Sequence, residues 1–327
     1  MTARETSFIA ALRAIAENPA ARGLNDDAAV LPFGDDHLVI THDMLVEGVH
    51  FLADDAAADV AWKLVAVNMS DLAAKGATPV GIIIGYALAG ANARDCAWDV
   101  DFVAGLETAA AHFAAPLLGG DTVALPSGAP RTLGLTALGR ASPGGTPSRS
   151  GAQPGDTVWV SGCIGDAGLG LAIRQGASAD GLADADRTAL LSAYARPLPD
   201  LPLGQMLAPL VTAIADVSDG LLLDAHRIAA ASDCAIRLSL DCVPLSDGYV
   251  AARGSAADAV IAAATAGDDY VLLFTAPAGR DAAIRAAAVQ HRCRLSKIGR
   301  CHVGTGLALD YRGTAVPLPH SLGWLHD

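Results

Sequence analysis

One central stretch decides the fold: DVAWKLVAVNMSDLAAKGATPVGIIIGYAL, residues 59–88. It predicts a helix followed by a strand. We expect Asp59 to cap the helix and Gly76 to end it, because acidic N-caps and C-terminal glycines are common helix limits. Leu64, Val65 and Leu72 recur at helical spacing and would face a core. Residues 79–88 are apolar and interrupted by glycine, which is typical of a buried strand.

A polar stripe lies on another face of the same predicted helix. Asn68, Asp71 and Lys75 are three and four residues apart, so they share one side of it. A solvated helix face explains Asp71 as well as a functional role does. Asp71 therefore needs partners from other segments before it counts as a site residue.

Strands and helices alternate on both sides of this stretch. The segment at 142–148 is rich in turn-forming residues and is the best linker. We therefore predict an N-terminal domain at 1–147 and a C-terminal domain at 148–327, each α/β or α+β. The further helices expected are 6–17, 96–114 and 221–231, and the further strands are 38–41, 133–138, 157–161, 213–215, 271–275 and 307–310.

Size, charge and signals restrict the class of protein. A chain of 327 residues favours two domains, and 52% hydrophobic residues supply ample core. The net charge of −13 opposes binding to nucleic acid or to an anionic membrane. No apolar run is long enough to span a bilayer, and the first residues lack an export signal. The six cysteines form no C-x-x-C pair, so we expect a cytoplasmic protein with reduced thiols.

Aspartates recur at glycine-flanked, turn-like positions where predicted elements end. Carboxylates that converge from distant segments repel one another and require a cation. Aspartate is a hard oxygen ligand, which suits magnesium that also carries phosphates. The only lysines are Lys63, Lys75 and Lys297, so a polyanionic ligand would depend on metal and a few arginines. The sequence thus predicts a metal–phosphate site, with candidate members Asp26, Asp27, Asp43, Asp71, Asp121, Asp216, Asp219, Asp268 and Asp269.

Each of these motifs also has an ordinary structural interpretation. Asp216 to Asp219 could merely cap a helix, and Asp121 could lie in a plain turn. Arg149 could be a surface arginine, and Trp324 could be buried in a core. The glycines from Gly162 to Gly170 do not match the G-x-G-x-x-G spacing of dinucleotide-binding proteins, so a tight structural turn is favoured for them.

Seven segments follow one another in order along nearly the whole chain: DDAAVL (26–31), THDMLVEGVHF (41–51), WKLVAVNMSDLAAKGA (62–77), LGGDT (118–122), RSGAQPGD (149–156), DVSDGL (216–221) and GDDY (267–270). Together they resemble the thiamine-monophosphate kinase family. The resemblance implies transfer of the ATP γ-phosphate to thiamine monophosphate, which yields thiamine diphosphate. It also implies the fold of aminoimidazole ribonucleotide synthetase-like enzymes, with two α/β domains and N-terminal domains that pair into a dimeric β-barrel.

The same resemblance implies residue roles. The partners would be ATP, thiamine monophosphate and a second copy of the chain, with several Mg²⁺ ions as cofactors. ATP would contact Gly120, Arg149 and Ser218. Thiamine monophosphate would contact His50, Asp268 and Trp324. The catalytic set would be Asp43, Asp71, Asp121 and Arg149, and the magnesium ligands would be Asp27, Thr41, His42, Asp43, Asp71, Asp121, Asp216 and Asp219.

Five positions depart from the family pattern. The family usually has glycine at Asn25, a hydroxyl residue at His42, often a second glycine at Ala266 and a glutamate at Val271. Asp268 replaces the glutamate of many relatives, which keeps the charge but shortens the reach. These departures leave two alternatives open. One is a sister ATP-dependent enzyme of the same fold, and the other is a catalytically silent thiamine-phosphate-binding protein.

Overall fold

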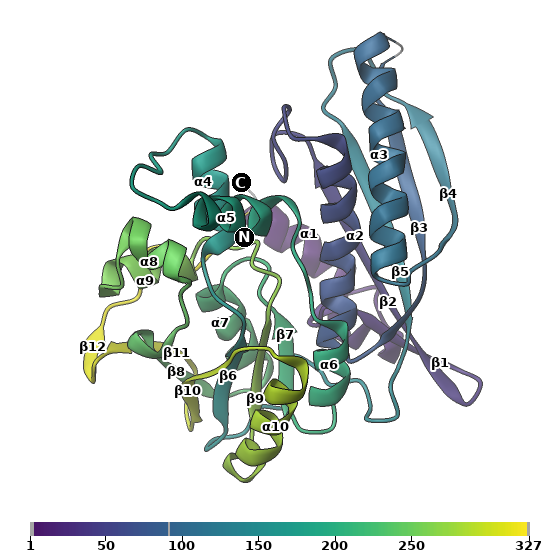
Figure 1. Cartoon of the computed structure of the whole chain (residues 1–327). Helices are drawn as coiled ribbons and strands as arrows, with labels where there is room; N and C mark the ends of the chain where they lie inside the picture. The colour runs from purple at the N-terminus through teal and green to yellow at the C-terminus, as the bar shows by residue number, and fades with distance from the viewer. Residues whose placement is uncertain (1–2, 91, 326–327) are drawn as a thin grey trace.

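The N-terminal half is built on a five-stranded sheet, and the computed structural model describes residues 3–90 and 92–325. Its elements are α1 (Ala3–Arg13), η1 (Pro19–Leu24), β1 (Ala29–Phe33), β2 (Asp36–Val46), α2 (Ala57–Ala74), β3 (Thr78–Leu88), α3 (Ala93–His112), β4 (Leu117–Ala124) and β5 (Thr132–Arg140). The strand order is β1-β2-β5-β3-β4, and only β3 and β4 are parallel. The helices α2 and α3 cover one face of the sheet (Figure 1).

The C-terminal half holds a mixed seven-stranded sheet. Its elements are β6 (Thr157–Ser161), α4 (Asp166–Arg174), α5 (Asp184–Ala195), α6 (Leu201–Leu207), β7 (Ala213–Asp216), α7 (Leu221–Ala231), β8 (Ala235–Ser239), η2 (Leu240–Cys242), α8 (Asp247–Arg253), α9 (Ala257–Ala264), β9 (Leu272–Ala276), η3 (Ala278–Arg280), α10 (Asp281–His291), β10 (Leu295–His302), β11 (Gly306–Tyr311) and β12 (Thr314–Val316). The strand order is β12-β11-β8-β10-β6-β9-β7. β7, which carries Asp216, is thus an edge strand next to α2.

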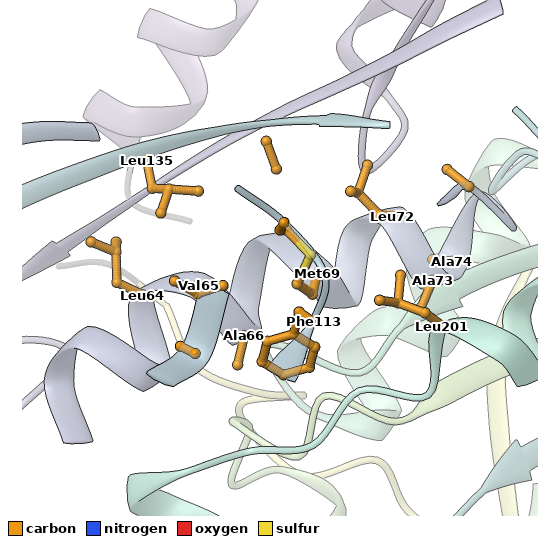
Figure 2. Close-up of a cluster of buried hydrophobic side chains, with 14 of the residues drawn as sticks. Leu64, Val65, Ala66, Met69, Leu72, Ala73, Ala74, Phe113, Leu135 and Leu201 are labelled. Carbon is orange, nitrogen blue, oxygen red and sulfur yellow. The ribbon is translucent and has the colours of Figure 1, made fainter. Parts of the chain in front are cut away.

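The helix α2 is buried on nearly all sides. Figure 2 shows its apolar side chains between Leu135 of β5, Phe113 at the end of α3 and Leu201 of α6. Apolar residues occupy most of the circumference of α2, which is typical of a helix in the interior. At Gly204 of α6, a Cβ would lie 2.0 Å from the carbonyl oxygen of Ala73, so α6 requires glycine to pack this closely. The helix of residues 57–74 therefore lies in the interior of the molecule, where it contacts elements of both halves.

One detail predicted for α2 is wrong. Ala56, not Asp59, occupies the N-cap, and Asp59 lies in the first turn, where it contacts Arg196. The sequence leaves the polar stripe open between a solvated face and a functional role, and the solvated interpretation does not hold, because Asn68 and Lys75 are fully buried. Gly76 does follow the helix in a left-handed conformation (φ 60°), as predicted for a C-terminal stop.

One hydrophobic core extends through both halves. It joins Leu64 and Leu135 of the first half to Trp159, Ile214 and Phe274 of the second. A second core fills the other face of the seven-stranded sheet, beneath α4 and α7. Neighbouring residues of β6, β7 and β9 alternate between the two cores, because successive side chains of a strand point to opposite faces.

Most predicted elements are confirmed, with shifted limits. The predictions for 157–161 and 221–231 match β6 and α7. The first helix ends four residues earlier than expected, at Arg13 rather than residue 17. The strand predicted at 38–41 is the centre of β2, so Asp43 lies within a strand and not at its end. Asp121 likewise lies inside β4, and residues 79–88 form a strand with only one covered face.

In the described part of the chain, no helix is both long and apolar enough to cross a bilayer. This agrees with the prediction made from the apolar runs of the sequence.

Candidate active site

Three aspartates from distant segments meet where the two halves join. Asp27 precedes β1, Asp71 lies on α2 and Asp216 ends β7, and carboxylate oxygens of all three lie within 4.8 Å of one another. The Thr41 hydroxyl donates to Asp71, and the Ser70 hydroxyl donates to Asp216 at 2.7 Å. The structure thus brings together four of the predicted metal ligands: Asp27, Thr41, Asp71 and Asp216.

Burial and mutual repulsion govern the charge of this carboxylate cluster. Burial raises the pKa of Asp71 well above its usual range, and the charges of Asp43 and Asp216 raise it further. Burial also raises the pKa of Asp43, which shares a hydrogen bond with Asp71. The pKa of Asp216 rises through burial and then through the charge of Asp27. These carboxylates therefore favour either protons or an added cation.

Buried cations hold the outer side of the cluster. The Lys75 ammonium lies 2.7 Å from Asp27 and also contacts Asp26, and the Arg149 guanidinium contacts Asp27. Arg22 pairs with Asp26 at 2.6 Å. Although burial opposes it, Lys75 and Arg22 hold the pKa of Asp26 below its usual range. Asp26 was a candidate member of the site to which the resemblance assigned no role, and its pairs with Lys75 and Arg22 fix the segment that carries Asp27. The signal for this contact in the sequence was a lysine in an otherwise largely apolar helix.

The loop after β7 is fixed by two residues that the sequence reasoning missed. Gly220 occupies the N-cap of α7 without a side-chain cap, so simple capping does not explain the motif. Asp224, one turn into α7, accepts the backbone N–H groups of Ser218 and Asp219 at 3.1 and 3.2 Å. Arg227 lies 2.6 Å from Asp219 and 2.8 Å from Asp224. Burial raises the pKa of Asp224 to about 6.

A cavity of about 410 Å³ connects this cluster to the residues expected to bind substrate. Asp43, Asp71, Asp216, Ser218 and Asp219 line one part of it. The rest is more aromatic and includes His50, Phe51, Tyr194, Asp268, Tyr270 and Trp324. All three predicted substrate residues therefore share one cavity with five of the predicted metal and ATP residues.

The three predicted substrate residues are fixed in different ways. His50 accepts the backbone N–H of Val46 through Nδ1 at 3.0 Å. Asp268 pairs with Lys63 at 2.6 Å. Trp324 is half exposed, and its backbone N–H donates to the Asp219 carbonyl at 2.8 Å. A core position for the tryptophan, which was the alternative, does not hold.

Three other predicted site residues lie apart from the cluster within this chain. Asp43 is in register with Gly120, three strands away, which is roughly 14 Å along the sheet. Asp121 follows Gly120 and points to the opposite face. His42 also points to that face, where its Nδ1 lies 2.9 Å from the Thr136 hydroxyl. Within this chain, His42 could therefore contribute to the metal site only through its main-chain atoms.

Two of the departures and the glycine-rich segment have structural explanations. Asp269 accepts the backbone N–H of Gly165, which precedes α4 with a φ of 90°. At Gly168 a Cβ would lie 2.3 Å from the Cβ of Ala266, so α4 packs directly on the loop before Asp268. Val271 packs against the second core. Gly165 thus lies in a structural turn, as the sequence favoured, and Gly168 permits a close packing contact.

The donor set of the cluster fits a hard divalent cation. Its candidate ligands are carboxylate and hydroxyl oxygens, which magnesium prefers over softer donors. The raised pKa of Asp71 has mutual repulsion among its causes, which a cation would relieve. Asp27, Asp43, Asp71, Asp216 and Asp219 are the residues that would hold it.

Two family models match the chain. Residues 25–141 match the N-terminal domain of AIR synthase related proteins, and residues 153–312 match the C-terminal domain. A thiamine-monophosphate kinase of Caulobacter vibrioides is 42% identical over 313 residues, which cover 94% of this chain and 86% of the relative. The thiamine-monophosphate kinase of Escherichia coli K12 is 39% identical over 78% of this chain and 76% of its own length.

Solved structures agree with these matches. The thiamine-monophosphate kinase from Stenotrophomonas maltophilia K279a has a TM-score of 0.77 at 37% identity, covering 95% of this chain and 96% of that one. AaThiL complexed with AMPPCP and TMP has a TM-score of 0.83 at 26% identity, covering 100% and 99%. The hydrogenase maturation protein HypE in complex with ATP shares the fold, with a TM-score of 0.68 over 94% of this chain and 91% of that one.

Proposed function

The chain belongs to the thiamine-monophosphate kinase family of AIR synthase related proteins, and from that premise we propose that it makes thiamine diphosphate from ATP and thiamine monophosphate. One observation carries the proposal. A single cavity joins the carboxylate cluster to His50, Asp268 and Trp324. A related structure with an ATP analogue and TMP bound supports the same two ligands.

Charge is the main obstacle to this reaction. The acceptor is a phosphate monoester oxygen that is already ionised at neutral pH, so no strong general base is needed. Two unit charges at about 4 Å and an effective dielectric near 20 repel by about 4 kcal/mol. Magnesium, when bound, would neutralise phosphate oxygens and the charge that develops on the transferred group.

The side chains of the protein orient the two phosphates. Asp27, Asp43, Asp71, Asp216 and Asp219 would hold the metal ions, and Asp224 with Arg227 keeps Asp219 in place. The planar guanidinium of Arg149 suits a phosphate oxygen pair. Burial alone would lower the pKa of Arg149, but Asp27 and its neighbours raise it, so the group stays cationic.

We propose direct in-line transfer without a phosphorylated enzyme. Single-turnover reactions with γ-labelled ATP test this step. We expect label to appear in thiamine diphosphate with no labelled protein at any time. A labelled protein that passes its phosphate to added thiamine monophosphate would overturn direct transfer.

We further propose that the chain works as a homodimer. On the sheet face opposite α2 and α3, Met44, Ile83 and Val123 are 50%, 40% and 57% exposed, and every residue of the edge strand β4 is exposed. Apolar surface and a free strand edge of this kind favour a second copy. The same copy could bring its Gly120 and Asp121 to the cavity, since these two lie apart from the cluster within one chain.

Mixed dimers test that arrangement. Asp71→Asn and Asp121→Asn chains, each inactive alone, are unfolded and refolded together. If Asp121 acts across the dimer, each mixed dimer keeps one intact site, and activity returns. If Asp121 acts within its own chain, mixing restores nothing.

Incubation with ATP, magnesium and thiamine monophosphate tests the activity itself. We expect thiamine diphosphate and ADP in equal amounts. Binding of both ligands without turnover would instead support the silent binding protein. Turnover of ATP only with a different acceptor would support a sister enzyme of the same fold.

A further inference from the structure

Asp268 occupies a strained position on the cavity wall. Its backbone φ is 64°, a left-handed value that non-glycine residues rarely adopt. The backbone N–H of Asp268 donates to the Ser218 carbonyl at 2.7 Å, and that of Tyr270 donates to the Val217 carbonyl at 2.8 Å. Such strain persists where surrounding contacts impose it, and it concentrates at functional sites.

Two donors fix the carboxylate of Asp268. The Lys63 ammonium lies 2.6 Å from Oδ2, and the Tyr270 hydroxyl donates to Oδ1 at 3.0 Å. The Asp268 side chain remains 31% exposed, whereas that of Lys63 is 3% exposed. Asp268 therefore faces the cavity, and Lys63 stands behind it.

Lys63 is itself held from several sides. Its ammonium lies 3.3 Å from the His50 carbonyl oxygen and 4.3 Å from the centre of the Tyr194 ring. The Tyr194 hydroxyl donates to Asp55 at 2.6 Å, which fixes the ring. A buried ammonium is costly unless it is paired, so its retention in the apolar helix α2 needs a compensating gain.

We propose that Lys63 is a positioning residue, which aims the Asp268 carboxylate at thiamine monophosphate. This inference rests on the proposed function. The thiazolium ring of the substrate is a permanent cation, and a fixed carboxylate is a suitable partner for it. Lys63 does not line the cavity, so it acts on the substrate through Asp268. The pair also joins α2 of the first half to the loop before β9 of the second.

Kinetics and binding of Lys63→Met, Lys63→Arg, Asp268→Asn and the Lys63→Met/Asp268→Asn double variant test the inference. We expect Lys63→Met to raise KM for thiamine monophosphate about tenfold, with KM for ATP changed less than about twofold. Lys63→Arg should recover part of the loss. Lys297→Met is the matched control, because Lys297 pairs with Asp281 away from the cavity, and it should leave both constants unchanged.

The double variant separates positioning from a general structural effect. If Lys63 acts through Asp268, Lys63→Met should add almost nothing to Asp268→Asn. Additive effects, or proportional changes in both KM values, would overturn the inference. Calorimetric binding of thiamine monophosphate without ATP gives the same comparison independently of turnover. A wild-type chain that binds but does not turn over would contradict the proposed function alone, while one that does not bind would contradict both.

Discussion

The two ends of the cavity balance charge in opposite ways. At one end, Asp27, Asp71 and Asp216 bring carboxylate oxygens within 4.8 Å, with Asp43 beside them. At the other end, the single carboxylate of Asp268 meets the single ammonium of Lys63. At the first end, the negative charges outnumber the positive charges of the neighbouring side chains. At the second end, one negative charge is balanced by one positive charge. Only the cluster end therefore requires an ion from outside the chain.

Removing one carboxylate from the cluster should have the largest effect. We expect Asp71→Asn to lower turnover by at least about a thousandfold, equivalent to about 4 kcal/mol of barrier, because it removes a central ligand. Without magnesium its melting temperature should equal or exceed that of wild type, since repulsion is relieved. Steady-state kinetics and thermal denaturation measure both. Asp59→Asn, on the same helix but outside the cavity, is the control, and near-normal turnover of Asp71→Asn would remove Asp71 from the cluster.

Removing a cation from the cluster should have the second-largest effect, a loss of folding stability. Lys75 is fully buried against Asp26 and Asp27, so Lys75→Met should lower the free energy of unfolding by about 3–5 kcal/mol. Urea denaturation gives the value, and saturating magnesium should recover part of it. The partly exposed pair of Lys297 and Asp281 serves as the control, and Lys297→Met should cost less than about 1 kcal/mol. A loss for Lys75→Met no larger than this would show that the cluster does not need its internal cation.

Acid should change the stability contributed by Asp224 and by Asp26 in opposite directions, because the pKa of Asp224 is raised and that of Asp26 is lowered. The pKa of Asp224 is raised to about 6 from 3.8, so its ionisation costs stability on the order of 3 kcal/mol at neutral pH. Without magnesium, the free energy of unfolding should therefore rise as pH falls from about 6 towards 4. Below about 4, the stability from Asp26 should be lost, because its pKa is lowered and protonation breaks its pairs.

Denaturation at a series of pH values in EDTA checks this pattern. Asp224→Asn should flatten the rise between about 6 and 4, while the loss below about 4 stays. A stability that falls steadily from neutral pH would contradict the raised pKa values of the cluster.

The smallest effect should come from the open side of the cavity. Trp324 is half exposed, so Trp324→Ala should change the free energy of unfolding by less than about 0.5 kcal/mol. A lost aromatic contact with substrate should still raise KM for thiamine monophosphate a few-fold, about 1 kcal/mol. An unchanged KM would limit the substrate-binding surface to His50 and Asp268.

Local patterns predicted much of the fold. A short apolar run bounded by glycines predicted β6, and a helical repeat of apolar residues predicted α7. The segments of the site were predicted from their resemblance to one family. Local patterns do not show which sheet face a residue takes. Asp43 and Asp121 lie on opposite faces because Asp43 is in register with Gly120, and Asp121 is the next residue along β4. They also lie far apart, because the strand order places β5 and β3 between their strands.

The partners of the buried lysines were the other part that could not be predicted. Lysine is ordinarily a surface residue, so Lys75 looked like part of a solvated stripe and Lys63 had no predicted contact. Both are buried because their partners, Asp26 with Asp27 and Asp268, arrive from distant segments. Such pairs become visible only once the chain is folded.

The burial of α2 has a consequence for synthesis on the ribosome. The helix leaves the ribosome well before its neighbours α6 and β7, which begin at Leu201 and Ala213. Until they arrive, one side of an almost wholly apolar helix has no permanent cover. Contacts between segments that are far apart in the sequence form slowly, and apolar surface that stays exposed meanwhile favours aggregation. We therefore expect a nascent chain halted near residue 147 to depend on chaperones, and the two domains to complete folding together.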